Sequence, residues 1–197
     1  KIKVWSLKFL LKIISTQSIN NSMAKSNYIQ SVVKAAKGRP KSTEWYREKI
    51  KEFGQPGAQD LIRDGKRRSS PFFGRLNMFF YDPKYKKTLP YYDTFPLVLP
   101  IDVIPGGFVG INFHYLRPGA RFRLLENLQR FAVRREVSSR NRFDVSYDRV
   151  KRLPLVKTTI KKYLYNNVRS SFLRVDFDEA AVAVYLPVAQ FKKGSPY

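Results

Sequence analysis

The first regular pattern of apolar residues along the chain predicts a helix. Tyr46, Ile50 and Phe53 recur at intervals of four and three residues, so they share one helical face. Ser42 or Thr43 can accept a hydrogen bond from a backbone N–H of the first turn and so cap this helix. We expect the folded domain to begin here.

The middle of the chain has the short apolar runs and turns that are typical of antiparallel strands. Residues 76–81, 95–101 and 108–116 are rich in aromatic and branched side chains, and turn-forming segments separate them. Pro96 and Pro100 cannot donate hydrogen bonds to a neighbouring strand, so the second strand is expected at an edge or at a bend. Together the three strands predict a small curled sheet or an SH3-like barrel.

A helix with an apolar stripe is predicted to follow these strands. Pro118 suits its first turn, where the missing N–H has no partner within the helix. Leu124, Leu125 and Leu128 form the stripe, and Phe131 extends it. Arginines surround the stripe, so we expect this helix to carry a basic surface.

A third helix is predicted later in the chain. Thr158 or Thr159 can cap it, and Ile160, Tyr163 and Leu164 would then face one side while lysines face the other.

The chain is predicted to end in a hairpin whose turn is acidic. Residues 172–177 and 182–186 would be its two strands. Asp176, Asp178 and Glu179 are close enough in sequence to suggest a magnesium site for a nuclease, since such sites need several converging carboxylates. A hairpin turn explains the same residues more simply, because Asp favours turns through local hydrogen bonds.

The N-terminal part of the chain lacks a comparable pattern. Residues 24–41 are polar, and Gly38 and Pro40 would break a helix, so a flexible basic arm is expected there. Residues 1–14 are basic and apolar by turns, and residues 1–22 are treated as an extension, with Met23 as a more ordinary start. An amphipathic anchoring helix at the start of this extension is an alternative, but no apolar run is long enough to span a bilayer.

These patterns predict an α+β fold. Residues 1–41 would form a basic N-terminal extension and arm, and residues 42–197 one domain with a small antiparallel sheet and two or three helices.

The charge of the chain indicates the kind of partner that it binds. The chain has 38 Lys and Arg against 15 Asp and Glu, a formal net charge of +23. Self-repulsion on this scale calls for an anionic partner, and nucleic acid is the most general one. Two basic blocks flank a nearly neutral aromatic centre. The candidates for contacts with DNA phosphates are Lys34, Lys37, Arg39, Lys41, Arg63, Lys66, Arg67, Arg68, Arg121, Arg130, Arg134, Arg135, Arg140, Arg142, Lys161 and Lys162.

Catalytic chemistry finds little support in the sequence. With no cysteine and one histidine, the chain cannot form disulfides or cysteine-based zinc sites, and His114 is expected to be structural or on the surface. No phosphate-binding loop or nucleophile elbow is present. The run Tyr91–Phe95 could stack on unpaired bases, but packing in the sheet core is the favoured interpretation. We predict no enzymatic activity, no metal, no cofactor and no small-molecule substrate.

Four segments carry a resemblance to a known family. They are FFYDPKYKKTLPYYDTFPLVLPI at 79–101, GFVGINFHYL at 107–116, RSSFLRV at 169–175 and VAVYLP at 182–187. The sequence resembles a virion protein group of T4-like tailed phages, that of the DNA end protector or head-completion protein, over roughly residues 42–193. The resemblance implies a virion protein that is made in the host cytoplasm. It brings no catalytic residues.

The residues and the resemblance together favour one function and leave others open. The first is a non-enzymatic virion protein that binds the DNA backbone without sequence preference and protects packaged DNA ends. The alternative is a structural neck, tail or baseplate protein whose basic arms bind other virion subunits. A ribonucleoprotein component and a nuclease are weaker hypotheses. The expected partners are DNA and other virion proteins, with no membrane.

Overall fold

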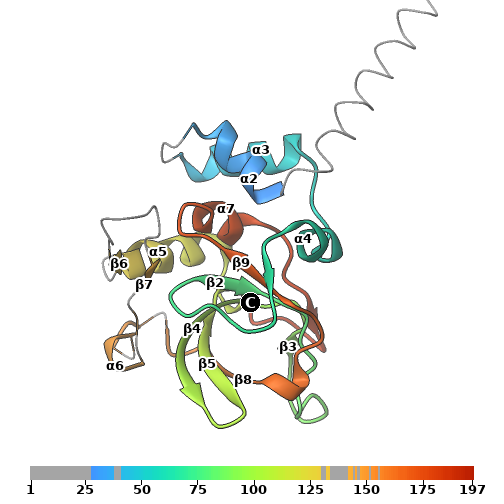
Figure 1. The fold of residues 1–197 in the computed structure, drawn as a ribbon. Helices are drawn as coiled ribbons and strands as arrows, with labels where there is room; N and C mark the ends of the chain where they lie inside the picture. Colours follow the sequence, from blue (N-terminus) through green and yellow to red (C-terminus); the bar gives the residue numbers. More distant parts are fainter. Residues whose placement is uncertain are drawn as a thin grey trace, which may run out of the picture.

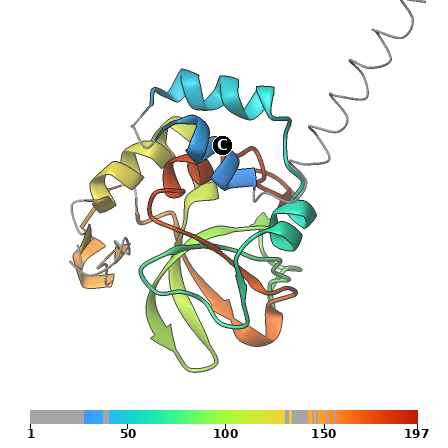
Figure 2. The same ribbon diagram turned by 45° about the horizontal axis from the view of Figure 1, so that its top comes forward.

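A layer of helices covers one face of a curled antiparallel sheet in the computed structural model of the protein (Figure 1). The structure describes residues 28–37, 41–129, 132–133, 142–143, 145, 147–150, 152–154 and 156–197. In Figure 2 the blue, cyan, yellow and red helices lie together above the strands. This arrangement confirms the α+β class.

The main sheet has six strands in the order β1-β9-β2-β4-β5-β8, and all neighbours are antiparallel. Their bounds are β1 Arg67–Arg68, β2 Leu76–Met78, β4 Leu97–Ile104, β5 Gly107–Asn112, β8 Ile160–Leu164 and β9 Phe172–Val175. Two smaller sheets pair β3 (Tyr92–Asp93) with β10 (Phe191–Lys192) and β6 (Ala132–Val133) with β7 (Arg142–Phe143). The described pairings leave β1 and β8 as edge strands, so an SH3-like barrel is not confirmed.

Strand β4 lies in the middle of the sheet, so the edge position predicted from its prolines is wrong and the predicted bend is right. The pairing with β5 shifts register between Pro100 and Asp102. A bulge of this kind interrupts the ladder and makes room for a residue without an N–H. Pro96 precedes the first residue of β4 and so needs no ladder bond.

The turn between β4 and β5 brings the backbone of β5 close to β8. Gly106 has a φ of 71°, which suits glycine in a tight turn. At Gly107 a Cβ atom would lie 2.0 Å from the carbonyl oxygen of Tyr163, so only glycine fits this contact. Gly107 pairs with Leu164 and thereby fixes where β8 sits along β5.

The helices are α2 (Tyr28–Ala35), α3 (Thr43–Glu52), α4 (Ala58–Asp64), α5 (Pro118–Gln129), α6 (Tyr147–Val150) and α7 (Ala180–Tyr185), with 3₁₀ turns η1 (Phe113–Tyr115) and η2 (Tyr165–Asn167). The predicted α3 is confirmed, with Ser42 as N-cap accepting a bond from the Trp45 N–H and with Tyr46 and Ile50 buried. The predicted α5 is confirmed as well, starting at Pro118 and burying its leucines. Phe131 lies outside the described residues.

The prediction of a helix after Thr158 is wrong, because residues 160–164 form edge strand β8. Ile160 and Tyr163 pair with Ile111 and Phe108 of β5, so branched and aromatic side chains follow their preference for strands. The second half of the predicted C-terminal hairpin is also wrong, because α7 takes its place. A short apolar run does not separate buried strand from buried helix, and the alanines of α7 favour the helix.

The prediction of a flexible arm is wrong for residues 28–35, which form α2. Ile29 and Val32 are almost fully buried in the main core, and α2 packs against α7. Ile29 and Val32 lie three residues apart. Two apolar positions among polar residues are too few to predict a helix from the sequence. Residues 1–27 and 38–40 lie outside the described residues, so the division of the chain near residue 41 stays a prediction.

The sheet is apolar on both faces, which creates two cores. Leu97 and Leu99 face the main core beneath the helices, whereas Val98 faces a separate cluster. That cluster is aromatic and consists of Phe79, Tyr81, Val98, Phe108, Tyr163 and Phe172. Phe95 is fully buried in the main core, as the packing interpretation of the aromatic run predicts. None of the helices in the described part of the chain is long and apolar enough to cross a membrane.

Candidate nucleic-acid interface

His114 is a buried structural residue. Its Nδ1 lies 2.9 Å from Oδ2 of Asp93, and both side chains are nearly inaccessible to solvent. Burial alone would raise the pKa of Asp93, but the charge and hydrogen bond of His114 and the Phe95 N–H outweigh it and lower this pKa. The structural interpretation of His114 is confirmed, although it lies in η1 and not in a strand.

Two basic residues near strand β1, Lys66 and Arg174, form ion pairs within the protein. Lys66 Nζ lies 2.5 Å from Asp176 and 3.2 Å from Glu179, and Arg174 Nε lies 2.9 Å from the other oxygen of Asp176. Burial raises the pKa of Asp176, but the hydrogen bond and charge of Lys66 and the charge of Arg174 lower it more. Lys66 therefore neutralises carboxylates of this chain. Asp176 and Glu179 lie in the segment between β9 and α7, and both are paired with cations.

The other candidates of the first basic block lie apart from one another. Arg63 pairs with Asp60 and Asp64 on α4. Arg67 and Arg68 are exposed on edge strand β1, and the Arg68 guanidinium lies 4.6 Å from the Phe72 ring centroid. On and after α2, Lys34 and Lys37 are exposed, and Lys41 is half-buried with its Nζ 5.6 Å from the Trp45 ring.

Arg121 is 3% exposed and does not offer its charge to a partner. Its Nε donates to the Leu116 carbonyl at 2.8 Å, and its Nη2 donates to the Tyr197 hydroxyl at 2.9 Å. Burial lowers the pKa of this guanidinium. The sequence prediction that Arg121 contacts DNA is therefore corrected: this side chain ties the last residue to the start of α5. Candidates whose side chains lie outside the described residues are Arg39, Arg130, Arg134, Arg135, Arg140 and Arg142.

The last two candidates, Lys161 and Lys162, line a pocket along strand β8. The pocket has a volume of about 680 Å³. Its other wall is the segment between Tyr81 and β3, which contributes lysine and several tyrosines. The lining residues that matter most here are Lys84, Tyr85, Tyr91, Tyr92, Tyr115, Lys161 and Lys162.

The aromatic wall of this pocket is built around Tyr115. The Tyr115 ring contacts Tyr91 at 5.8 Å and Phe191 at 5.2 Å between ring centroids. Lys161 Nζ lies 4.1 Å from the Tyr115 centroid, within cation–π range. Burial raises the pKa of Tyr115 and lowers that of Lys161, so both groups sit in a poorly hydrated wall.

The pocket is basic because the one carboxylate that lines it among the described residues is occupied by other contacts. Asp93 is the acidic residue in the lining that the described residues form. Both Asp93 oxygens are occupied: Oδ1 accepts from the Phe95 and Gln190 N–H groups, and Oδ2 contacts Asn112 and His114. Lys66 forms ion pairs with two carboxylates of the protein. Lys161 and Lys162 form no ion pair with another described residue.

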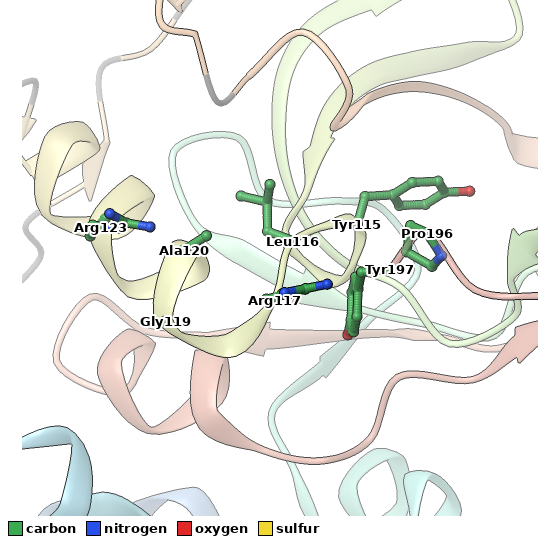
Figure 3. Close-up of a pocket in the computed structure, with 8 residues that line it drawn as sticks. All are labelled: Tyr115, Leu116, Arg117, Gly119, Ala120, Arg123, Pro196 and Tyr197. Carbon is green, nitrogen blue, oxygen red and sulfur yellow. The ribbon is translucent and has the colours of Figure 1, made fainter.

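A second pocket of about 490 Å³ adjoins the first through Tyr115 (Figure 3). Figure 3 shows Tyr115 beside Pro196, and Arg117 beside Tyr197, at the start of α5. Arg117 and Arg123 are exposed, and none of the described residues that line this pocket is acidic. The two pockets share Tyr115, and we call their combined lining, which is basic and aromatic, the β8 surface.

A family model described as Phage T4 terminal DNA protecting protein matches residues 10–197. The chain belongs to this family. The resemblance found in the sequence is thereby confirmed. Searches among curated proteins and among solved structures found no match.

Most residues of the β8 surface were not predicted as binding residues from the sequence. Lys84 lies at a turn, and Tyr85, Tyr115 and Arg117 come from segments that the fold brings together around β8. A usable signal was present in the interleaving of lysine and tyrosine between residues 84 and 92. That signal was obscured because β8 was predicted as a helix.

Proposed function

We propose that this protein binds the ends of linear duplex DNA through the phosphate backbone, without reading base sequence, and shields those ends from nucleases. The family description names DNA termini as what is protected. The net charge of +23 supports a polyanionic partner, since each neutralised phosphate releases a counterion.

The observation that carries this proposal is the uncompensated charge of the β8 surface. Lys84, Lys162, Arg117 and Arg123 are exposed and line these pockets, and within the described part of the chain the only acid in either lining is buried Asp93. A DNA phosphate could therefore pair with them without displacing an internal carboxylate. Phosphate contacts of this kind position a protein on DNA and carry no sequence information.

We propose a shield that has no hydrolytic activity. Within the described ranges, no three His, Asp or Glu side chains gather closely enough to hold a metal ion. The carboxylates that suggested a nuclease, Asp176 and Glu179, are held by Lys66. These observations support protection by coverage of the DNA end. We further propose that the protein is assembled in the host cytoplasm, is carried in the virion and contacts other virion proteins.

The test compares DNA that differs only in its ends. Linear duplex and the same molecule closed into a circle are titrated with the full chain, and the linear form is then exposed to a processive exonuclease. We expect tighter binding to the linear form and slower digestion at saturation. Equal binding to both forms, with unchanged digestion, would contradict end protection and favour a neck, tail or baseplate component that contacts other virion subunits.

A further inference from the structure

We propose that the 680 Å³ pocket along β8 holds an unpaired nucleotide at the end of a DNA strand. The inference rests on the proposed function and names the part of the DNA end that is recognised. The volume falls within the roughly 300–1,000 Å³ that is usual for small-ligand pockets.

The walls of the pocket fit the two halves of a nucleotide. Tyr85, Tyr91 and Tyr92 offer aromatic rings on one side, and such rings stack on any base because every base has a π-face. Lys161 of β8 places its Nζ 4.1 Å from the Tyr115 ring centroid and can neutralise the phosphate, and Lys162, the next residue of the strand, also lines the pocket. Stacking combined with lysine contacts gives affinity without sequence readout.

The segment that carries Tyr85 is held in place by hydrogen bonds within the protein. Asp82 N–H donates to the Asn167 carbonyl at 2.9 Å, and the Asn167 side-chain amide donates to the Asp82 carbonyl at 2.7 Å. At the far end of the loop, Lys193 Nζ donates to the Lys87 carbonyl at 2.7 Å. A wall that is anchored at both ends loses little conformational freedom on binding.

The exposure of Tyr85 is the observation that most needs an explanation. Tyr85 is 65% exposed and lines the pocket next to Lys84, whose Nζ lies 5.5 Å from the ring. An exposed ring adds nothing to the core. It is well placed to cover a base that enters the pocket.

A strand terminus is the source of nucleotide that this geometry favours. A base inside a duplex must lose its pairing and both stacking neighbours before it can enter a pocket, whereas a terminal or overhanging base loses much less. The adjoining second pocket shares Tyr115 and carries Arg117 and Arg123, so the phosphates that follow the captured nucleotide have a basic path. A free mononucleotide would use only the first pocket.

The experiment places 2-aminopurine as a single-nucleotide overhang and, in a second duplex, at an internal paired position. We expect the fluorescence of the overhang base to change on binding and that of the internal base to stay constant. Tyr85→Ala should weaken affinity for overhang DNA about tenfold, as expected for loss of base–aromatic stacking. Tyr85→Phe keeps the ring and should bind within about twofold of the parent.

Matched controls separate the pocket from general surface effects. Tyr147 is 45% exposed on α6 and does not line the pocket, so Tyr147→Ala should bind overhang DNA like the parent. Hairpin-capped DNA without strand ends should bind Tyr85→Ala and the parent equally. Deoxyadenosine monophosphate should compete at least about 100-fold more weakly than overhang DNA, because it cannot use the second pocket.

The outcomes distinguish this inference from the proposed function. If end preference persists while Tyr85→Ala binds normally and the overhang fluorescence does not change, the pocket assignment is wrong and end protection stands. If deoxyadenosine monophosphate binds as tightly as overhang DNA, the pocket serves free nucleotides and the assignment to a strand terminus fails. If Tyr85→Ala retains DNA binding but is not incorporated into particles, the pocket contacts a protein. If the parent shows no end preference, the proposed function itself fails.

Discussion

The two edges of the main sheet carry similar basic sequences in opposite surroundings. At one edge, Lys66 precedes β1 and pairs with Asp176 and Glu179, whereas Arg67 and Arg68 of β1 itself are exposed. At the other edge, Lys161 of β8 lies over the Tyr115 ring, and among the described residues Asp93 is the only acid that lines the pocket of Lys161 and Lys162. The difference teaches that a basic residue in the sequence is available to a partner only where the fold does not pair it with an internal acid, as it pairs Lys66.

The largest expected effect comes from detaching β8. Gly107→Ala would put a Cβ atom 2.0 Å from the Tyr163 carbonyl oxygen, so β5 and β8 must move apart. We expect a loss of about 3 kcal/mol in unfolding free energy, at the upper end of the usual cost of overpacking. Chemical denaturation measures this loss, and DNA binding should fall with it because the wall of Lys161 and Lys162 is displaced.

Gly106→Ala is the matched control for that change. Gly106 has a positive φ but nothing within 4 Å of an added Cβ, so the cost should be about 1 kcal/mol. Equal costs for the two variants would show that the close approach of β5 and β8 does not fix the edge.

The second effect separates a structural lysine from a binding lysine. Lys66→Ala leaves Glu179, 2% exposed, without its cation partner. Because Lys66 itself is partly exposed, we expect a loss of only about 1–2 kcal/mol in unfolding free energy. The affinity for linear DNA should stay unchanged. A DNA-binding defect in a normally stable Lys66→Ala protein would make the β1 edge part of the interface.

The converse change is made at the β8 edge. Lys162→Ala removes an exposed side chain, so stability should change by less than about 0.5 kcal/mol. The slope of log affinity against log salt should decrease by about 0.9, the value for one phosphate contact on duplex DNA. Lys51→Ala, an exposed lysine on α3, should leave the slope unaltered. An unaltered slope in Lys162→Ala would remove this residue from the interface.

The smallest effect is a dependence of stability on pH at the β1 edge. The pKa of Asp176 is lowered in the folded protein, so its ion pairs stabilise the fold above the pKa of the unfolded chain. This contribution is lost as the pH falls below about 4, where the unfolded chain takes up the proton first. Asp176→Asn should therefore flatten the acid limb of the stability profile. An identical limb in both proteins would contradict the lowered pKa.

Sequence reasoning predicted the parts of the fold that have local signals. The cap at Ser42, the helix from Pro118 and the turn at Gly106 are each specified by neighbouring residues. It failed where tertiary contacts decide. The apolar run of α7 suits a strand as well as a helix until burial against α2, α3 and α5 is known, and β8 becomes a strand because β5 offers it a partner.

The same limit applies to the candidate interface. Composition indicated a polyanionic partner, but it did not tell which cations are free. Arg121 and Lys66 look like any other basic residues in the sequence, and only the fold reveals the acceptors and carboxylates that occupy them. The tyrosines of the β8 surface come from separate segments, so their common location depends on pairings such as Lys192 with Tyr92.

The most direct test of the difference between the two edges is photo-crosslinking from a DNA end. A duplex with 5-iodouracil as its terminal overhanging base is irradiated in complex with the full chain, and the cross-linked peptide is identified by mass spectrometry. We predict cross-links to Tyr85, Tyr91 or Tyr92, which line the pocket along β8. Cross-links concentrated at Phe72, which lies against Arg68 and Arg174 at the β1 edge, would contradict it.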